Sequence, residues 1–278
     1  MSSTRGASTP LHSTLLRARR RVEAVIACGG PQIVFQPIVR ADDGAIEGYE
    51  ALSRFPPGGG DTEAWFTDAA HCGLGPELDR SAAVRALDES ARLPCESFVA
   101  VNLSAATLLV DTPLIELLLD AARRRPLVVE ITEHAAFDDE DAVVAVLGDL
   151  RRGGVAVAVD DVGSAYAGMR HLVLLEPEIV KLDAFVVHEM RANRAKLALA
   201  ELVLEFARKT DARCVFEGVE TYDDLEAAIS VGADLLQATE SVALQRWICL
   251  SEAVFSGCGR RSSLVSTPHV PLLPRQRR

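Results

Sequence analysis

Short apolar segments alternate with amphipathic segments along most of this chain, and this alternation limits the folds open to it. It predicts parallel strands joined by right-handed helical crossovers, and eight such units fit a closed barrel. The predicted strands are 97–103, 127–132, 155–160, 178–183, 213–217 and 233–237, and the predicted helices are 106–123, 140–152, 166–174, 192–209 and 222–231.

The first two strands are expected to pair differently. Ile33–Val39 and Ala45–Phe55 are strand-like, and the turn sequence Ala41-Asp42-Asp43-Gly44 between them predicts a hairpin. Helical periodicity is present at 13–27 and 65–93. We expect a disordered N-terminus over 1–12, a barrel domain over 13–256, and a disordered basic, proline-containing tail over 257–278.

The composition of the chain argues against several classes of function. The net charge of -11 argues against binding a nucleic-acid polymer, because phosphate backbones need a basic face. No apolar run is long enough to span a membrane. The six cysteines lie far apart without Cys-x-x-Cys spacing, which favours reduced thiols and a cytoplasmic location over a zinc site or disulfides. A phosphorylated small molecule remains a suitable ligand if divalent metals invert the local field.

Two adjacent carboxylates, Asp160 and Asp161, follow the apolar strand 155–159 directly. Like charges fixed side by side repel unless a cation lies between them, which favours a metal site with oxygen ligands. An aspartate helix cap with Asp161 in solvent explains the same pair equally well. The pair alone leaves both interpretations open.

Polar residues also close the other apolar strands, about one in each βα unit. In a parallel barrel these strand ends lie on one face, where barrel enzymes place their chemistry. Singly, each is explained by a solvated strand end; together they predict a site. The residues are Glu50, Asn102, Glu130, Asp160, Lys181, Glu217 and Gln237.

Most of these side chains offer oxygen, which suits Mg²⁺ or Mn²⁺, and no His or Cys accompanies them. There are enough donors for two ions that share a bridging aspartate, an arrangement suited to hydrolysing a phosphodiester. Lys181 would then contact the attacking water or a phosphate oxygen. The predicted ligands are Glu50, Asn102, Glu130, Asp160, Asp161 and Glu217.

Seven motifs follow one another along the chain: Gln36-Pro37-Ile38, Glu50-Ala51-Leu52 with Arg54, Val101-Asn102-Leu103-Ser104, Glu130-Ile131-Thr132-Glu133, Asp160-Asp161-x-Gly163, Val180-Lys181-Leu182-Asp183 and Glu217-Gly218-Val219-Glu220-Thr221. They span about residues 20 to 245, close to the whole expected folded part. This ordered set resembles the EAL-domain cyclic di-GMP phosphodiesterase family.

The resemblance implies a TIM-like (β/α)8 barrel that hydrolyses cyclic di-GMP to linear pGpG. It implies a first metal on Glu50, Asn102, Glu130 and Asp160, and a second on Asp160, Asp161 and Glu217. It further implies that Lys181 and Glu217 position or deprotonate water, with Glu133 supporting the loop after Asp161 in this catalytic group. Arg54 would hold a substrate phosphate, and Gln237 and Glu220 would lie either behind the metal ligands or at the wall near the guanine. Relatives of this kind commonly dimerise near the aspartate loop, so a homodimer is expected.

Two segments depart from the family pattern. The family loop Phe-Gly-Thr-Gly-Tyr-Ser-Ser is Val162–Gly168 here, with Ala165 in place of a glycine, and the usual Gln-Gly-Tyr is Gln237-Ala238-Thr239. These changes favour a weakly active or inactive cyclic di-GMP receptor or protein-interaction module, whereas the retained ligand set favours catalysis. A barrel enzyme for another phosphate ester is a third possibility, which would leave the motif matches as coincidence.

Overall fold

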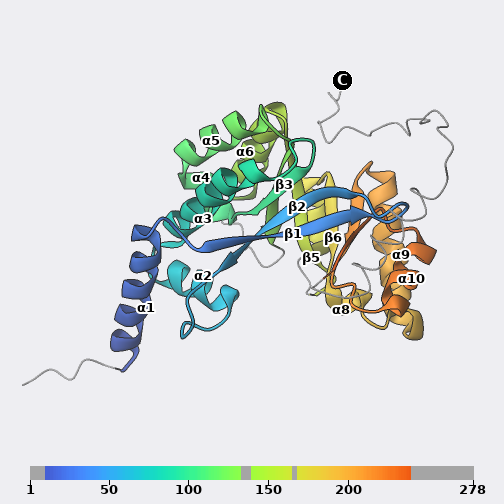
Figure 1. Cartoon of the computed structure of the whole chain (residues 1–278), viewed down its shortest axis with the longest axis horizontal. Coiled ribbons are helices and arrows are strands. Elements are labelled where there is room, and N and C mark those ends of the chain that lie inside the picture. The colour runs from blue at the N-terminus through green and yellow to red at the C-terminus, as the bar shows by residue number, and fades with distance from the viewer. Residues whose placement is uncertain (1–9, 133–138, 165–167, 239–278) are drawn as a thin grey trace, which may run out of the picture.

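The computed structural model describes residues 10–132, 139–164 and 168–238. Within them eight strands form a closed barrel in chain order, with helices around the outside, so the predicted TIM-like α/β barrel is confirmed (Figure 1). The strands are β1 Gln32–Arg40, β2 Ile46–Arg54, β3 Phe98–Asn102, β4 Leu127–Thr132, β5 Val155–Val162, β6 Ile179–Leu182, β7 Arg213–Phe216 and β8 Leu235–Gln237.

Strand β1 is the exception to the parallel arrangement. It runs antiparallel to β2, which confirms the predicted hairpin, and antiparallel to β8, which closes the barrel. The first residue of β1, Gln32, pairs with Arg54 at the end of β2. Strands β2 to β8 are parallel, so their carboxyl ends share one mouth of the barrel.

The helices follow the predicted alternation, with boundary differences. The first helix begins at Pro10, inside the segment expected to be disordered, and the short α8 was not predicted. The predicted helices 65–93 and 106–123 are each divided in two. The α-helices are α1 Pro10–Ala27, α2 Thr62–His71, α3 Gly75–Glu89, α4 Ala105–Val110, α5 Thr112–Ala122, α6 Glu140–Arg152, α7 Gly168–Leu175, α8 Ala184–Val187, α9 Arg194–Lys209 and α10 Tyr222–Val231.

Both divisions have local causes. The carboxylate of Asp111 accepts a hydrogen bond from the Leu114 amide and so caps α5, and Pro113 lies in the first turn of that helix. Between α2 and α3, Gly73 has a φ of +68°, which a helix cannot accommodate. In both places the hydrophobic residues keep a helical spacing, although the helix itself ends. Short local signals, namely a capping aspartate followed by proline in one case and a glycine in the other, end the helix there.

Successive side chains along each strand point alternately into the barrel and out toward the helices, so the strands contribute to two separate hydrophobic cores. One set of strand residues packs inside the barrel, and the intervening residues pack outward against the helices. The inward set is Ile38, Phe98, Ala100, Val128, Ala156, Ala158, Ile179, Val215 and Leu235.

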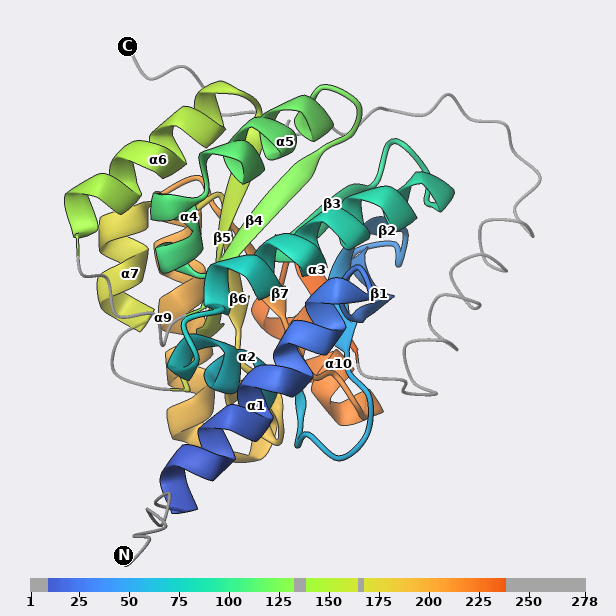
Figure 2. The same cartoon turned by 90° about the vertical axis from the view of Figure 1, so that its left-hand side faces the viewer.

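A third, smaller cluster lies outside the barrel. Helix α1 crosses α2 and α3 (Figure 2), and Val22 and Val25 pack with Trp65 and Leu78 between these helices. Phe55, the residue after β2, joins the edge of the cluster. The N-terminal helix is therefore packed against the segment that follows β2.

Candidate active site

The polar residues at the strand ends continue the inward-facing columns of the barrel. Glu130 lies two residues after the inward Val128, Asp160 two after Ala158, and Lys181 two after Ile179. Asn102, Glu217 and Gln237 follow Ala100, Val215 and Leu235 in the same way. A period of two places these side chains over the apolar core, at the mouth where the parallel strands end.

Strand β5 has an irregular register between Val159 and Val162, where it pairs with β6. Asp161 within this irregularity has a φ of 58°, a left-handed conformation that aspartate tolerates better than most residues. A regular strand would send neighbouring side chains to opposite faces, whereas a bulge re-aims them. The irregularity explains how both aspartates reach one site.

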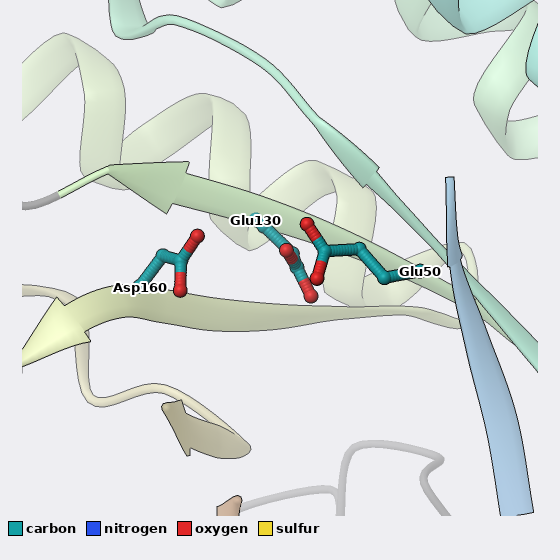
Figure 3. A group of neighbouring side chains, drawn as sticks. All are labelled: Glu50, Glu130 and Asp160. Carbon is teal, nitrogen blue, oxygen red and sulfur yellow. The ribbon is translucent and has the colours of Figure 1, made fainter. Parts of the chain in front are cut away.

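Among the residues that the structure describes, two groups of carboxylates form at this mouth and share one residue. Glu50, Glu130 and Asp160 have ligand oxygens within 4.8 Å of one another, and so do Asp160, Asp161 and Glu217. The side chains of the first group turn toward one another from β2, β4 and β5 (Figure 3). Either group could hold a metal ion, and Asp160 could contact both.

Lys181 is buried in the middle of these carboxylates, with 1% of its surface exposed. Its Nζ lies 3.0 Å from Glu50 Oε2, 2.9 Å from Glu130 Oε2, 3.0 Å from Asp160 Oδ1 and 2.8 Å from Glu217 Oε1. Burial opposes the charged amine, but these carboxylates outweigh it and raise the pKa of Lys181 well above its ordinary value. The lysine is therefore a permanent internal cation.

One ammonium does not balance four carboxylates. Burial, reinforced by the neighbouring Glu50, raises the pKa of Glu130 well above its ordinary value, against the attraction of Lys181. Burial and the nearby Asp160 do the same to the pKa of Glu217, and burial also raises the pKa of Asp160. The site holds excess negative charge in a buried position, which protons or divalent cations can relieve.

Glu50 accepts hydrogen bonds from two side-chain amides in addition to Lys181. It accepts from Asn102 Nδ2 at 2.9 Å and from Gln237 Nε2 at 2.6 Å. Burial raises the pKa of Glu50, but Lys181 and these two amides outweigh burial and lower it overall. Gln237 Oε1 is buried and accepts no hydrogen bond from the described residues, which leaves an acceptor for a ligand or water.

Three predicted residues lie outside this cluster. Arg54 is exposed at the end of β2, where its Nη1 donates to the carbonyl of Ser53 at 3.0 Å. Glu220 is exposed in the loop after β7, 3.9 Å from His188 Nε2, and belongs to neither carboxylate group. Glu133 lies outside the described residues.

Two residues that shape the site, Gln36 and Asp79, have no role predicted from the sequence. Gln36 on β1 donates through Nε2 to the carbonyl of Ala238 at 2.7 Å and so ties β1 to the end of β8. Asp79 on α3 is buried and accepts from the Ser104 amide and the Thr107 hydroxyl, which fixes the segment after Asn102. Gln36 could have been found because it precedes the inward Ile38 by two residues, whereas nothing in the sequence links Asp79 to this segment.

The donor set fits hard divalent cations. Carboxylate oxygens dominate both groups, and Asn102 supplies an amide next to Glu50. Mg²⁺ and Mn²⁺ prefer such oxygen ligands, whereas zinc sites usually contain His or Cys. The buried negative charge and the unsatisfied Gln237 Oε1 fit the same interpretation.

Fold and site together define a TIM-like barrel with a buried acidic centre at the carboxyl ends of its parallel strands. The EAL domain family model matches residues 19–237. The chain belongs to the EAL domain family.

Similar proteins carry cyclic di-GMP names. The chain is 30% identical over 203 residues to the probable cyclic di-GMP phosphodiesterase PdeG of Escherichia coli K12, covering 69% of this chain and 40% of PdeG. It is 30% identical over 218 residues to the bifunctional diguanylate cyclase/cyclic di-GMP phosphodiesterase MucR of Pseudomonas aeruginosa, covering 73% of this chain and 31% of MucR. This chain thus spans less than half the length of either protein.

The fold is also similar to that of Klebsiella pneumoniae BlrP1 in its manganese and cyclic di-GMP complex. The TM-score is 0.66 at 27% identity, covering 75% of this chain and 54% of BlrP1. Within the described part of this chain, no helix is long and apolar enough to cross a membrane.

Proposed function

We propose that this chain hydrolyses cyclic di-GMP to linear pGpG with two divalent cations, Mg²⁺ or Mn²⁺. The observation that carries the proposal is the pair of carboxylate groups that share Asp160. Glu50, Asn102, Glu130 and Asp160 would hold the first cation, and Asp160, Asp161 and Glu217 the second. Such a pair supplies hydroxide near neutral pH and neutralises charge on the phosphate.

The remaining residues would orient substrate and water. Glu217 would orient or deprotonate the attacking water, and Lys181 would exchange part of its carboxylate contacts for that water or a phosphate oxygen. Arg54 would hold a phosphate at the edge of the mouth, and Gln237 and Glu220 would line the guanine end. Glu133 would support the loop after Asp161.

The test is incubation of purified protein with cyclic di-GMP and either metal, followed by chromatography of the products. We expect pGpG that disappears with chelator and in Glu50→Ala. Intact substrate together with tight calorimetric binding would reject hydrolysis and favour the second candidate, a cyclic di-GMP receptor. The departures at Ala165 and Ala238 support that candidate.

Two further parts of the proposal concern the protein in the cell. We place it in the cytoplasm, because its cysteines lack any metal or disulfide spacing and a cytoplasmic second messenger is its proposed substrate. We also propose a homodimer formed near the loop after Asp161. A monomer by light scattering at micromolar concentration would contradict the dimer.

A further inference from the structure

An aromatic stack joins the N-terminal helix to the end of β2. The rings of Phe55 and Trp65 are stacked, with centroids 4.8 Å apart and planes at 8°. Arg21 of α1 places its guanidinium carbon 4.6 Å from the centre of the Trp65 ring, and it also forms an ion pair with Asp68 of α2. The Trp65 ring is therefore held between a residue of α1 and the residue that follows β2.

The segment after β2 is fixed to this stack at more than one point. Gly59 packs so closely on the Trp65 ring that an added Cβ would lie 2.3 Å from Trp65 Cε2. At the base of the loop, Thr62 Oγ1 donates to the Ser53 carbonyl at 3.2 Å, and that carbonyl also accepts from Arg54. Helix α2 therefore contacts this segment on both sides of Arg54: Thr62 bonds to the carbonyl of Ser53, and Trp65 packs against Phe55 and Gly59.

We propose that Arg21 is a positioning residue for substrate binding, which acts through Trp65 and Phe55 to hold the loop 55–61 and the adjacent Arg54 in place. This inference rests on the proposed function in one respect, namely that Arg54 contacts a substrate phosphate. It makes α1 part of the binding apparatus, although no residue of α1 lies in either carboxylate group.

The contact requires arginine and not only a positive charge. A planar guanidinium can stack on the indole and pair with Asp68 at the same time, whereas a lysine ammonium is a point charge that keeps the ion pair more easily than the stack. Arg21→Lys therefore separates the stack from the charge. Arg20→Lys is the matched control, because Arg20 is exposed on the same helix.

The experiment measures two quantities in the full chain: hydrogen–deuterium exchange of peptides that cover 53–61, and KM and kcat for cyclic di-GMP with Mn²⁺. For Arg21→Lys we expect faster exchange in 53–61 and a KM raised about threefold to tenfold, the range of a lost cation–π contact, with kcat within about twofold of wild type. Asp68→Asn should give a smaller change in the same direction. Arg20→Lys should change neither quantity.

Wild-type exchange and KM in Arg21→Lys would overturn the inference, as would a fall in kcat with KM unchanged. If the wild-type protein hydrolyses no cyclic di-GMP, the proposed function fails. The exchange measurement then still tests whether Arg21 holds the loop. Wild-type exchange in 53–61 for both Arg21→Lys and Asp68→Asn would reject that role.

Discussion

Lys181 Nζ lies 2.8 Å from Glu217 Oε1, and the same ammonium contacts a carboxylate from each of β2, β4 and β5. The Lys181 side chain thus links its own strand, β6, to β2, β4 and β5 and to the residue that follows β7. Because it is buried, its loss leaves several uncompensated charges in a poorly solvated position.

Lys181→Met should lower the free energy of unfolding of the metal-free protein by about 3 kcal/mol, the cost of breaking a buried charge pair. Mn²⁺ should restore part of the loss by supplying the missing positive charge, while turnover stays low. Urea unfolding with chelator and with Mn²⁺ measures both effects. Lys209→Met, at an exposed ion pair with Glu205, should change stability by less than about 1 kcal/mol. Equal stability of the two variants in chelator would contradict the internal-cation role.

Asp160→Asn should abolish turnover and weaken both metal sites, because Asp160 is common to both carboxylate groups. Asp161→Asn should weaken only the second site. Asparagine suits the left-handed backbone at this position, so the exchange changes the charge with little strain. Mn²⁺ titration by calorimetry distinguishes the two variants, and wild-type turnover in Asp160→Asn would reject the two-metal assignment.

Gly218→Ala should lower both stability and turnover. A Cβ at Gly218 would lie 2.4 Å from the Ala184 Cβ on α8, so Glu217 next to it must shift or α8 must move. We expect a loss of about 1 to 3 kcal/mol in urea unfolding. Gly73→Ala is the control, because it introduces the backbone strain without the clash. Gly73 has a φ of +68°, close to the +62° of Gly218, but nothing lies within 4 Å of a Cβ added there. Similar losses in both variants would mean that backbone strain alone explains the effect.

His171 on α7 should make stability depend on pH. Burial, helped by the neighbouring Arg170 and opposed by Glu140, lowers the pKa of His171 below its ordinary value of 6.5. The unfolded chain then binds this proton more readily, so the stabilising contribution is complete above about pH 6.5 and declines as pH falls toward the lower folded-state pKa. Urea unfolding between about pH 5 and 7.5 should show a shallower decline in His171→Gln. Parallel stability curves would contradict this prediction.

The barrel and the hairpin could be predicted from the sequence, because both leave local signals. The barrel follows from strands that alternate with helices, and the hairpin from the turn residues between its two strands. Sequence periodicity was insufficient for the helix breaks at Gly73 and Asp111, since the hydrophobic period continues across each. Helix α8 was not predicted, because its four residues are too few to show a helical period.

For the site, strand ends were enough to select the residues that meet at the mouth, but not their contacts. The contact of Lys181 with the attacking water or a phosphate oxygen stays a prediction, whereas the carboxylates that surround its amine here were not predicted. A strand position fixes which way a side chain leaves the backbone, whereas the partner of a long flexible chain depends on the strands opposite. The Asp79 contacts were missed for the same reason, because they join elements distant in the sequence.

The reversed direction of β1 has a practical consequence for attaching other molecules to this protein. In an all-parallel barrel the chain enters its first strand at the end remote from the chemistry, whereas here Gln32 enters beside Arg54. A bulky group inserted just ahead of Gln32 would therefore crowd the mouth and compete with incoming ligand. The turn 41–45 lies at the opposite end of the same hairpin, and it is the better place for a reporter or a surface tether.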